Sequence, residues 1–244
     1  MGQMDRNGMS ETEWREVVGS LEDIGPYYEK VNMLMTFGLV DRWRRRVAAL
    51  AKPDETVLEI GPGPGYFTRH LKADTIYCLE PSLDFAYSTK GMLDMGKICL
   101  VKGVAEKIPL AQGSVDKVFC MFSFRDFFDK PAALGEINRV LREGGEIVVA
   151  DVAKPDSAPL AKMIEVHFKR LIPVLARVAI GPSSRDVWAR DPYYRLVQTW
   201  NAYGSPSDYE ALFMKTGFVD VSTEYLELKG AAMTRGTKPW KSTS

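Results

Sequence analysis

Histidine, cysteine and net charge are scarce in this chain of 244 residues. Two histidines, His70 and His167, cannot form a His-based metal cluster and give little support to a Ser/His/Asp nucleophile. Cys78, Cys99 and Cys120 lack metal-pair spacing, so we expect buried, reduced thiols in a cytosolic setting. Because 32 basic residues balance 32 acidic ones, no global field attracts nucleic acid. We therefore predict no metal and no nucleic-acid partner.

Long apolar runs are also missing. No stretch reaches about 18 uncharged apolar residues, the length that a membrane-spanning helix needs. The N-terminus lacks the basic-then-apolar pattern of a signal peptide. The chain length suits one α/β domain with added helices. We expect a cytoplasmic protein, with peripheral contact to a membrane left open.

From residue 55 onward, short apolar runs alternate with helical patterns, which is typical of βαβ units around a parallel sheet. Strands are predicted at 55–60, 75–80, 97–101, 115–121 and 145–151, and helices at 65–72, 83–91, 131–142 and 207–216. The last two strands, near 218–227 and 229–236, add an antiparallel edge. The predicted fold is α/β: a doubly wound, mostly parallel, Rossmann-like sheet of seven strands, with N-terminal helices and a helical insertion before the last two strands.

Four segments follow from this pattern. They are an N-terminal helical cap at 1–54, an α/β core at 55–153, a helical segment at 154–206, and a final helix with the antiparallel strand pair at 207–244. Within the third segment, residues 160–180 are apolar and basic, and Pro173 interrupts them. This stretch suits a lid over an apolar substrate, docking on a membrane surface, or a helix packed on the core.

An apolar strand ending in a carboxylate runs directly into three alternating glycines at residues 57–66. A dinucleotide fingerprint carries its third glycine three positions after the second, where this chain has Tyr66. Pro62 and Pro64 remove two backbone N–H donors that a loop around a diphosphate needs. The pattern therefore favours a mononucleoside, S-adenosylmethionine (SAM), over NAD.

Two acids accompany the glycine loop. Glu59 ends the first strand at the mouth of the sheet and suits the ammonium group of SAM. Glu80 ends the second strand about 20 positions after the first glycine, the usual distance for an acid that accepts from ribose hydroxyls. The candidate cofactor residues of this region are Glu59, Gly61, Pro62, Gly63, Pro64, Gly65, Glu80 and Pro81.

Residues 103–110 and 114–119 resemble the class I SAM-dependent methyltransferases. In that class the first segment borders adenine and the second enters the fourth strand. Val104 stands where members commonly carry Asp or Asn, so the resemblance implies adenine contacts from the backbone of Val104 and Ala105. Glu106 is expected either to line the site or to be a solvated loop acid.

Four further segments resemble the ubiquinone/menaquinone biosynthesis C-methyltransferases: residues 28–44, 122–126, 151–155 and 194–236. The resemblance runs from about residue 27 to the C-terminus. It implies a SAM-dependent methyltransferase acting on a small hydrophobic acceptor, with carbon methylation of a prenylated quinol or related ring as the leading hypothesis. O- or N-methylation of another small molecule, and SAM binding without catalysis, stay open.

The chain departs from that family pattern around the cofactor. Tyr66 replaces an acid in a position suited to a base, Pro64 replaces Ser or Thr, and Met121 replaces a serine near the cofactor. Met121 is nevertheless a candidate cofactor residue. These differences indicate a divergent member whose acceptor and base are open, as is its oligomeric state.

Methylation of a ring carbon needs a base or a cation that stabilises a phenolate. Arg125 is the main candidate, because a fixed guanidinium can hold a phenolate or orient a water. The alternative is a structural ion pair of Arg125 with Asp126 or Glu136. Asp126 is also the nearest acid for proton removal. Tyr28 either contacts the acceptor ring or packs in the core, and it completes the catalytic candidates.

Overall fold

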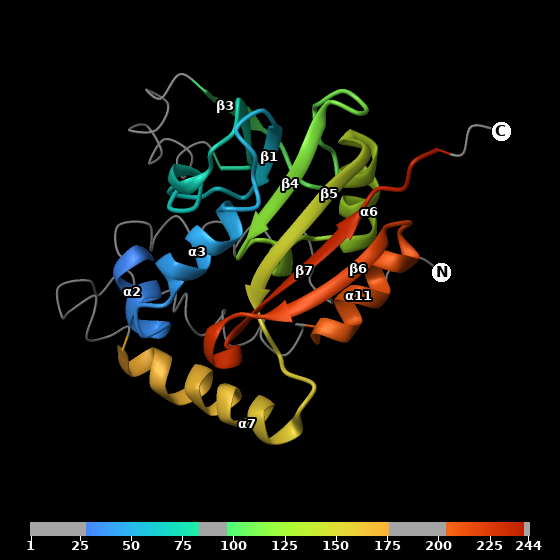
Figure 1. Cartoon of the computed structure of the whole chain (residues 1–244). Helices are drawn as coiled ribbons and strands as arrows, with labels where there is room; N and C mark the ends of the chain where they lie inside the picture. Colours follow the sequence, from blue (N-terminus) through green and yellow to red (C-terminus); the bar gives the residue numbers. More distant parts are fainter. Residues whose placement is uncertain (1–27, 83–96, 176–203, 242–244) are drawn as a thin grey trace.

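Seven strands form one sheet in the structure, a computed structural model that describes residues 28–82, 97–175 and 204–241 (Figure 1). The strand order is β3-β2-β1-β4-β5-β7-β6. The strands are β1 (Thr56–Ile60), β2 (Thr75–Glu80), β3 (Ile98–Lys102), β4 (Val115–Met121), β5 (Leu141–Val152), β6 (Val219–Tyr225) and β7 (Ala231–Thr237). Neighbouring strands from β3 to β5 are parallel, whereas β7 is antiparallel to both β5 and β6. The predicted mostly parallel sheet with an antiparallel edge is confirmed.

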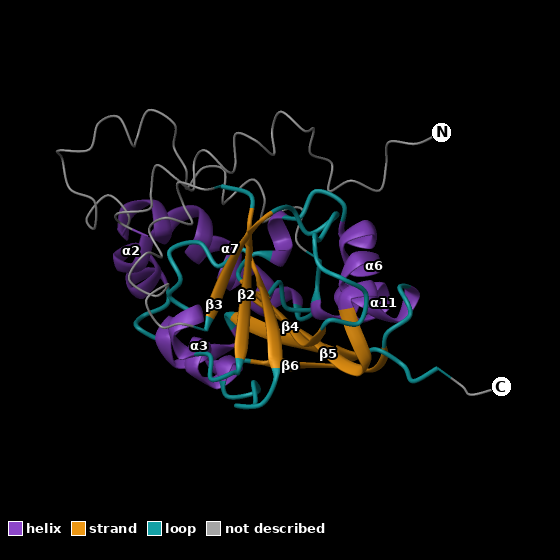
Figure 2. Cartoon of the chain, turned by 90° about the horizontal axis from the view of Figure 1, so that it is seen from above, coloured by secondary structure: helices purple, strands orange, loops and turns teal. Residues whose placement is uncertain are grey.

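Helices cover both faces of the sheet, and Figure 2 shows α3 and α6 on opposite sides of it. The α-helices of the described residues are α2 (Tyr28–Met35), α3 (Val40–Ala48), α6 (Lys130–Val140), α7 (Ala158–Val166) and α11 (Pro206–Lys215). On one face, Leu134 of α6 and Phe213 of α11 pack with apolar side chains of β1 and β4. On the other face, Trp43 and Val47 of α3 pack with the alternate side chains of the same strands. Burial on both faces explains why these strands are apolar almost throughout.

The helix predicted at 131–142 ends early, at Val140, and β5 begins at once. Gly144 and Gly145, which follow the predicted helix, lie inside β5. Gly144 has a φ of +74°, and a Cβ there would come within 2.5 Å of the Trp240 ring. These glycines therefore accommodate an irregular strand and the returning C-terminal segment.

Two other expectations were wrong in part. The helix predicted at 65–72 is only a 3-10 turn, η2 (Thr68–His70), because the chain turns extended at Leu71 to enter β2. Of the three thiols expected to be buried, Cys99 is exposed on the edge strand β3. The predicted helix at 83–91 lies outside the described residues.

The predicted helical insertion begins with α7 and continues as a π-helical turn, η4 (His167–Leu171). Residues 176–203 of that segment lie outside the described part of the chain, and so do residues 1–27 of the N-terminal cap. The division into four segments therefore stays a prediction. In the described ranges, no helix combines the length and the apolar character needed to cross a membrane.

Candidate active site

A cavity lies at the carboxyl ends of β1, β2 and β4, where doubly wound sheets bind ligands. Its empty volume is about 1000 Å³, part of which is open solvent. The predicted site residues that line it are Glu59, Gly61, Pro62, Gly63, Glu80, Pro81, Val104, Ala105, Glu106, Met121, Arg125 and Asp126. Pro64 and Gly65 support the loop without lining the cavity. Tyr28 begins α2, and its side chain lies outside what the structure describes.

The glycine loop is tightly folded against the turn after β4. Gly61 has a φ of +72°, which favours glycine, and a Cβ there would come within 2.6 Å of the Ser123 Cβ. The Ser123 hydroxyl donates to the carbonyl of Ile60 at 2.6 Å. The loop thus brings the ends of β1 and β4 together and leaves its backbone at the cavity wall.

The backbone N–H groups of the loop are all engaged within the protein. Gly61 N–H donates to the carbonyl of Leu79 at 2.9 Å, and Gly65 N–H donates to the carbonyl of Pro62 at 2.9 Å. Gly63 N–H donates to Glu80 Oε2 at 3.2 Å. The two prolines have no N–H. This loop cannot cradle a diphosphate, which supports the choice of SAM over NAD.

Glu59 is a buried acid with a spare oxygen. Its side chain is 1% exposed and lines the cavity. Its Oε2 has no hydrogen-bond partner among the described residues. Burial raises the pKa of the Glu59 carboxyl to about 8, and the nearby Glu80 carboxylate adds to this rise. An unpaired buried carboxyl is costly, and an incoming ammonium group would satisfy it.

Glu80 ends β2 beside the loop and is 5% exposed. One carboxylate oxygen accepts from Gly63 N–H and the other accepts from Ser82 N–H at 3.3 Å. These two bonds fix the orientation of the carboxylate at the cavity wall, and a carboxylate accepts several hydrogen bonds at once. The geometry fits the predicted role.

The third wall of the cavity comes from the turn after β3. Val104 bridges to Lys107, which folds this turn back on itself. Ala105 is 5% exposed and Val104 lines the cavity, so backbone and small side chains are presented to a ligand. Glu106 lines the cavity, yet its Oε1 accepts from Asp129 N–H at 3.0 Å. Glu106 therefore also ties this turn to the start of α6.

Arg125 and Asp126 form a buried charge cluster with Asp151 at the opposite wall. Arg125 Nη1 donates to Asp151 Oδ1 at 2.7 Å, and Arg125 Nε lies 3.5 Å from Asp126 Oδ2. The ion pair with Asp126 is thus present, whereas the suggested pair with Glu136 is not, because Glu136 bonds Arg139 instead. The hydrogen bond to Asp151 restricts rotation of the Arg125 side chain. This pair was not predicted from the sequence.

Burial shifts the pKa values of two groups in this cluster, Asp126 and Lys130. Burial raises the pKa of Asp126, while Arg125 and Lys130 oppose the rise. Burial also lowers the pKa of the Lys130 ammonium to about 8, against the attraction of Asp126. Acids with raised pKa values in a cavity are candidates for general bases.

The sequence reasoning missed several lining residues. Arg44 of α3 and Tyr66 line the cavity, and the Arg44 guanidinium carbon lies 5.2 Å from the Tyr66 ring centroid. Phe122 and Phe127 add aromatic surface near Asp126. In the sequence, only the family pattern of residues 28–44 pointed to Arg44. No local pattern places Arg44 in the cavity wall, because its contacts come from distant parts of the chain.

The residues present fit SAM. Glu59 offers an unpaired buried oxygen for the ammonium group, Glu80 is held beside the glycine loop where it can accept from ribose, and the loop lacks the free N–H groups that a diphosphate requires. The fold and this site together define a class I SAM-dependent methyltransferase.

The chain belongs to the ubiE/COQ5 methyltransferase family, whose model matches residues 8–238. A protein of Thermus thermophilus named demethylmenaquinone methyltransferase is 29% identical over 228 residues, covering 89% of this chain and 99% of the relative. A protein of Mycobacterium marinum with the same name is 32% identical over 230 residues, covering 92% of this chain and 94% of the relative. The family resemblance predicted from the sequence is confirmed.

Solved structures agree on the fold. A SAM-dependent methyltransferase of Thermotoga maritima, described as a possible histamine N-methyltransferase, aligns with a TM-score of 0.64 at 21% identity, covering 91% of this chain and 99% of that one. A Haloferax volcanii putative methyltransferase complex with the Trm112 activator also gives 0.64, at 16% identity, covering 90% and 98%. At such identities the likeness concerns the fold alone.

Binding of SAM is expected to release a proton, and SAM affinity is expected to rise with pH toward 8. Below pH 8 the Glu59 carboxyl of the ligand-free protein is protonated, because its pKa is raised to about 8. The SAM ammonium favours the carboxylate, so binding expels that proton. Calorimetry in two buffers of different ionisation enthalpy measures the release. Glu59→Gln should abolish it, and a wild-type protein that releases no proton would contradict the assignment.

Proposed function

We propose that the protein transfers the methyl group of SAM to a ring carbon of a reduced, demethylated prenylquinone. The relatives named demethylmenaquinone methyltransferase support this acceptor. The observation that carries the proposal is the cavity wall formed by Phe122 and Phe127 with the Asp126–Arg125 pair. An aromatic acceptor that carries an acidic hydroxyl matches this combination of aromatic surface and the Asp126 carboxyl.

Asp126 takes the proton of a ring hydroxyl in this proposal, which makes the adjacent ring carbon nucleophilic. Arg125, fixed by Asp151, stabilises the negative charge on the ring oxygen. The phenyl rings position the acceptor and exclude water. When bound, SAM supplies the electrophilic methyl group. Transfer would break the bond between the sulfonium and its methyl group and leave S-adenosylhomocysteine. The methylated carbon would then release its proton to solvent, and the ring oxygen would take back the proton held by Asp126.

Radiolabelled SAM with a reduced demethylated quinone tests this function. We expect label in a lipid-soluble product with the reduced acceptor, and little label with the oxidised quinone, because the oxidised ring has no hydroxyl for Asp126 to deprotonate. Absence of a labelled lipid product with either form would contradict the proposed acceptor.

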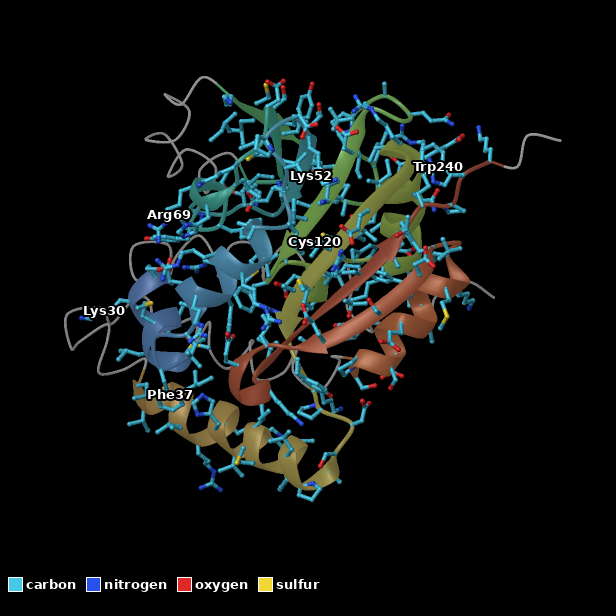
Figure 3. All side chains as sticks on the ribbon, viewed as in Figure 1. Lys30, Phe37, Lys52, Arg69, Cys120 and Trp240 are labelled. Atoms are coloured by element: carbon cyan, nitrogen blue, oxygen red, sulfur yellow. The ribbon has the colours of Figure 1, made fainter. Side chains whose placement is uncertain are left out.

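An apolar face outside the cavity suits a lipid-soluble acceptor. Val166 of α7 is 51% exposed, Val174 is 54% exposed, and Phe37, 67% exposed, stacks on His167 with ring centroids 5.4 Å apart. Figures 1 and 3 show α7 and Phe37 together at one end of the molecule, beyond the carboxyl ends of β4 and β5. Three basic side chains lie on the same helical stretch, Lys162, Lys169 and Arg170, and Glu165 forms ion pairs with the two lysines. Apolar side chains beside basic ones favour an anionic lipid surface, and we propose that this face rests on one.

The wild-type protein is therefore expected to sediment with vesicles that contain anionic lipid more than with neutral vesicles. The double variant Phe37→Glu/Val166→Glu should lose most of this binding, because two carboxylates would enter the lipid interface. Met214→Glu is the matched control, since Met214 is 58% exposed on α11, which packs against β6. Equal sedimentation of the double variant and the wild type would contradict lipid contact at this face.

A further inference from the structure

Arg44 is a buried arginine in the cavity wall, and the mechanism above gives it no role. Its side chain is 2% exposed on α3. Its Nη1 donates to the Glu29 oxygens at 2.8 and 2.7 Å. Its Nε and Nη2 make no hydrogen bond to the described residues. Two N–H-bearing nitrogens of a guanidinium in the cavity wall are thus left for a ligand.

The position of this guanidinium is fixed by its surroundings. Glu29 holds one end through the ion pair, and the Tyr66 ring lies 5.2 Å away. Arg69 packs on the same ring at 5.1 Å and lies 3.9 Å from Glu29. A guanidinium held in this way loses little conformational entropy when it binds a ligand.

The amino-acid end of SAM presents an ammonium and a carboxylate, which need an acceptor and a donor respectively. The glycine loop supplies no donor, because each N–H from Gly61 to Gly65 is engaged or replaced by proline. Arg125 is bound to Asp151 on its Nη1. Arg44 also lines the cavity, and its Nε and Nη2 make no hydrogen bond to the described residues.

We propose that Arg44 binds the α-carboxylate of SAM, beside Glu59, which receives the ammonium group. The two side chains lie within electrostatic reach, since the Arg44 guanidinium opposes the burial that raises the pKa of Glu59. Paired recognition of this kind selects SAM by its zwitterionic end as well as by its nucleoside. This proposal depends on SAM as the cofactor and does not depend on the identity of the methyl acceptor.

Calorimetry with SAM and with decarboxylated SAM tests this role without any acceptor. The decarboxylated compound keeps the ammonium and the sulfonium but lacks the carboxylate. The wild type should bind SAM about 10-fold to 100-fold more tightly, the range expected for charged hydrogen bonds. In Arg44→Met this preference should disappear, because SAM affinity falls while affinity for the decarboxylated compound stays nearly constant. Arg44→Lys should restore part of the preference.

Arg69→Met is the matched control. Arg69 contacts the same Tyr66 ring and Glu29, but it does not line the cavity. This variant should keep the wild-type preference for SAM. The proposal is overturned if Arg44→Met retains that preference, or if Arg69→Met loses it equally. A rise in KM for the acceptor with an unchanged preference would assign Arg44 to the acceptor instead.

Discussion

Replacing Asp126 with asparagine is expected to lower kcat by about 10²-fold to 10⁴-fold, the usual contribution of a general base. The amide keeps the shape of the side chain but cannot accept the hydroxyl proton. Asp126 lines the cavity 3.5 Å from Arg125 Nε and follows β4, whereas the glycine loop follows β1. SAM affinity should therefore be nearly unchanged, as calorimetry on the variant would show.

The pH profile separates proton transfer from a structural role for Asp126. Burial raises the pKa of Asp126, and the base works only when deprotonated. For the wild type, kcat should fall on the acid side through a pKa above that of an ordinary aspartate. Asp126→Asn should lose this acid limb. Asp74→Asn, at an exposed acid before β2, is the control and should keep both rate and profile. An Asp126→Asn enzyme with wild-type kcat would refute the base.

Replacing Glu80 with alanine is expected to weaken SAM binding by about 100-fold or more, because each hydrogen bond to a charged group contributes about 1.5–3 kcal/mol. The alanine also leaves Gly63 N–H without its carboxylate acceptor. Glu80→Gln is the matched variant, since its amide oxygen can still accept from one partner. Calorimetry on both variants measures the loss.

A 2′-deoxyribose analogue of the demethylated cofactor distinguishes ribose recognition from loop support by Glu80. The wild type should bind the deoxy compound more weakly than its parent compound. In Glu80→Gln this difference should shrink, because an amide cannot accept from two hydroxyls and two backbone donors together. Unchanged SAM affinity in Glu80→Ala would contradict the cofactor map.

Local sequence signals predicted most of the sheet and the cofactor side of the cavity. Strands such as β4 are buried on both faces and are apolar along most of their length, and the spacing of Glu80 from the glycine loop follows from the connection between the parallel strands β1 and β2. Helix and strand limits were less predictable. In the sequence, Gly144 stands where a glycine commonly ends a helix. In the structure it lies within β5, and the ring of the distant Trp240 packs against it.

Contacts between distant segments account for the functional residues that the sequence did not reveal. Arg44 acquires its place in the site from Glu29, one helix earlier, and from Tyr66, beyond β1. Asp151 anchors Arg125 across the sheet from the end of β5. Tyr66 replaces the acid expected at the loop, and Asp126 brings a carboxylate to another wall of the same cavity. The acceptor side therefore depends on tertiary packing more than the cofactor side does.

The position of the transferred carbon tests the central claim most directly. SAM carrying a ¹³C methyl group would be turned over with the reduced, demethylated prenylquinone, and the lipid product would be examined by NMR. A base at Asp126 that generates a ring-carbon nucleophile predicts a label on the ring as an aryl methyl group. A label that appears as a methoxy group, or no labelled lipid at all, would contradict carbon methylation by this site.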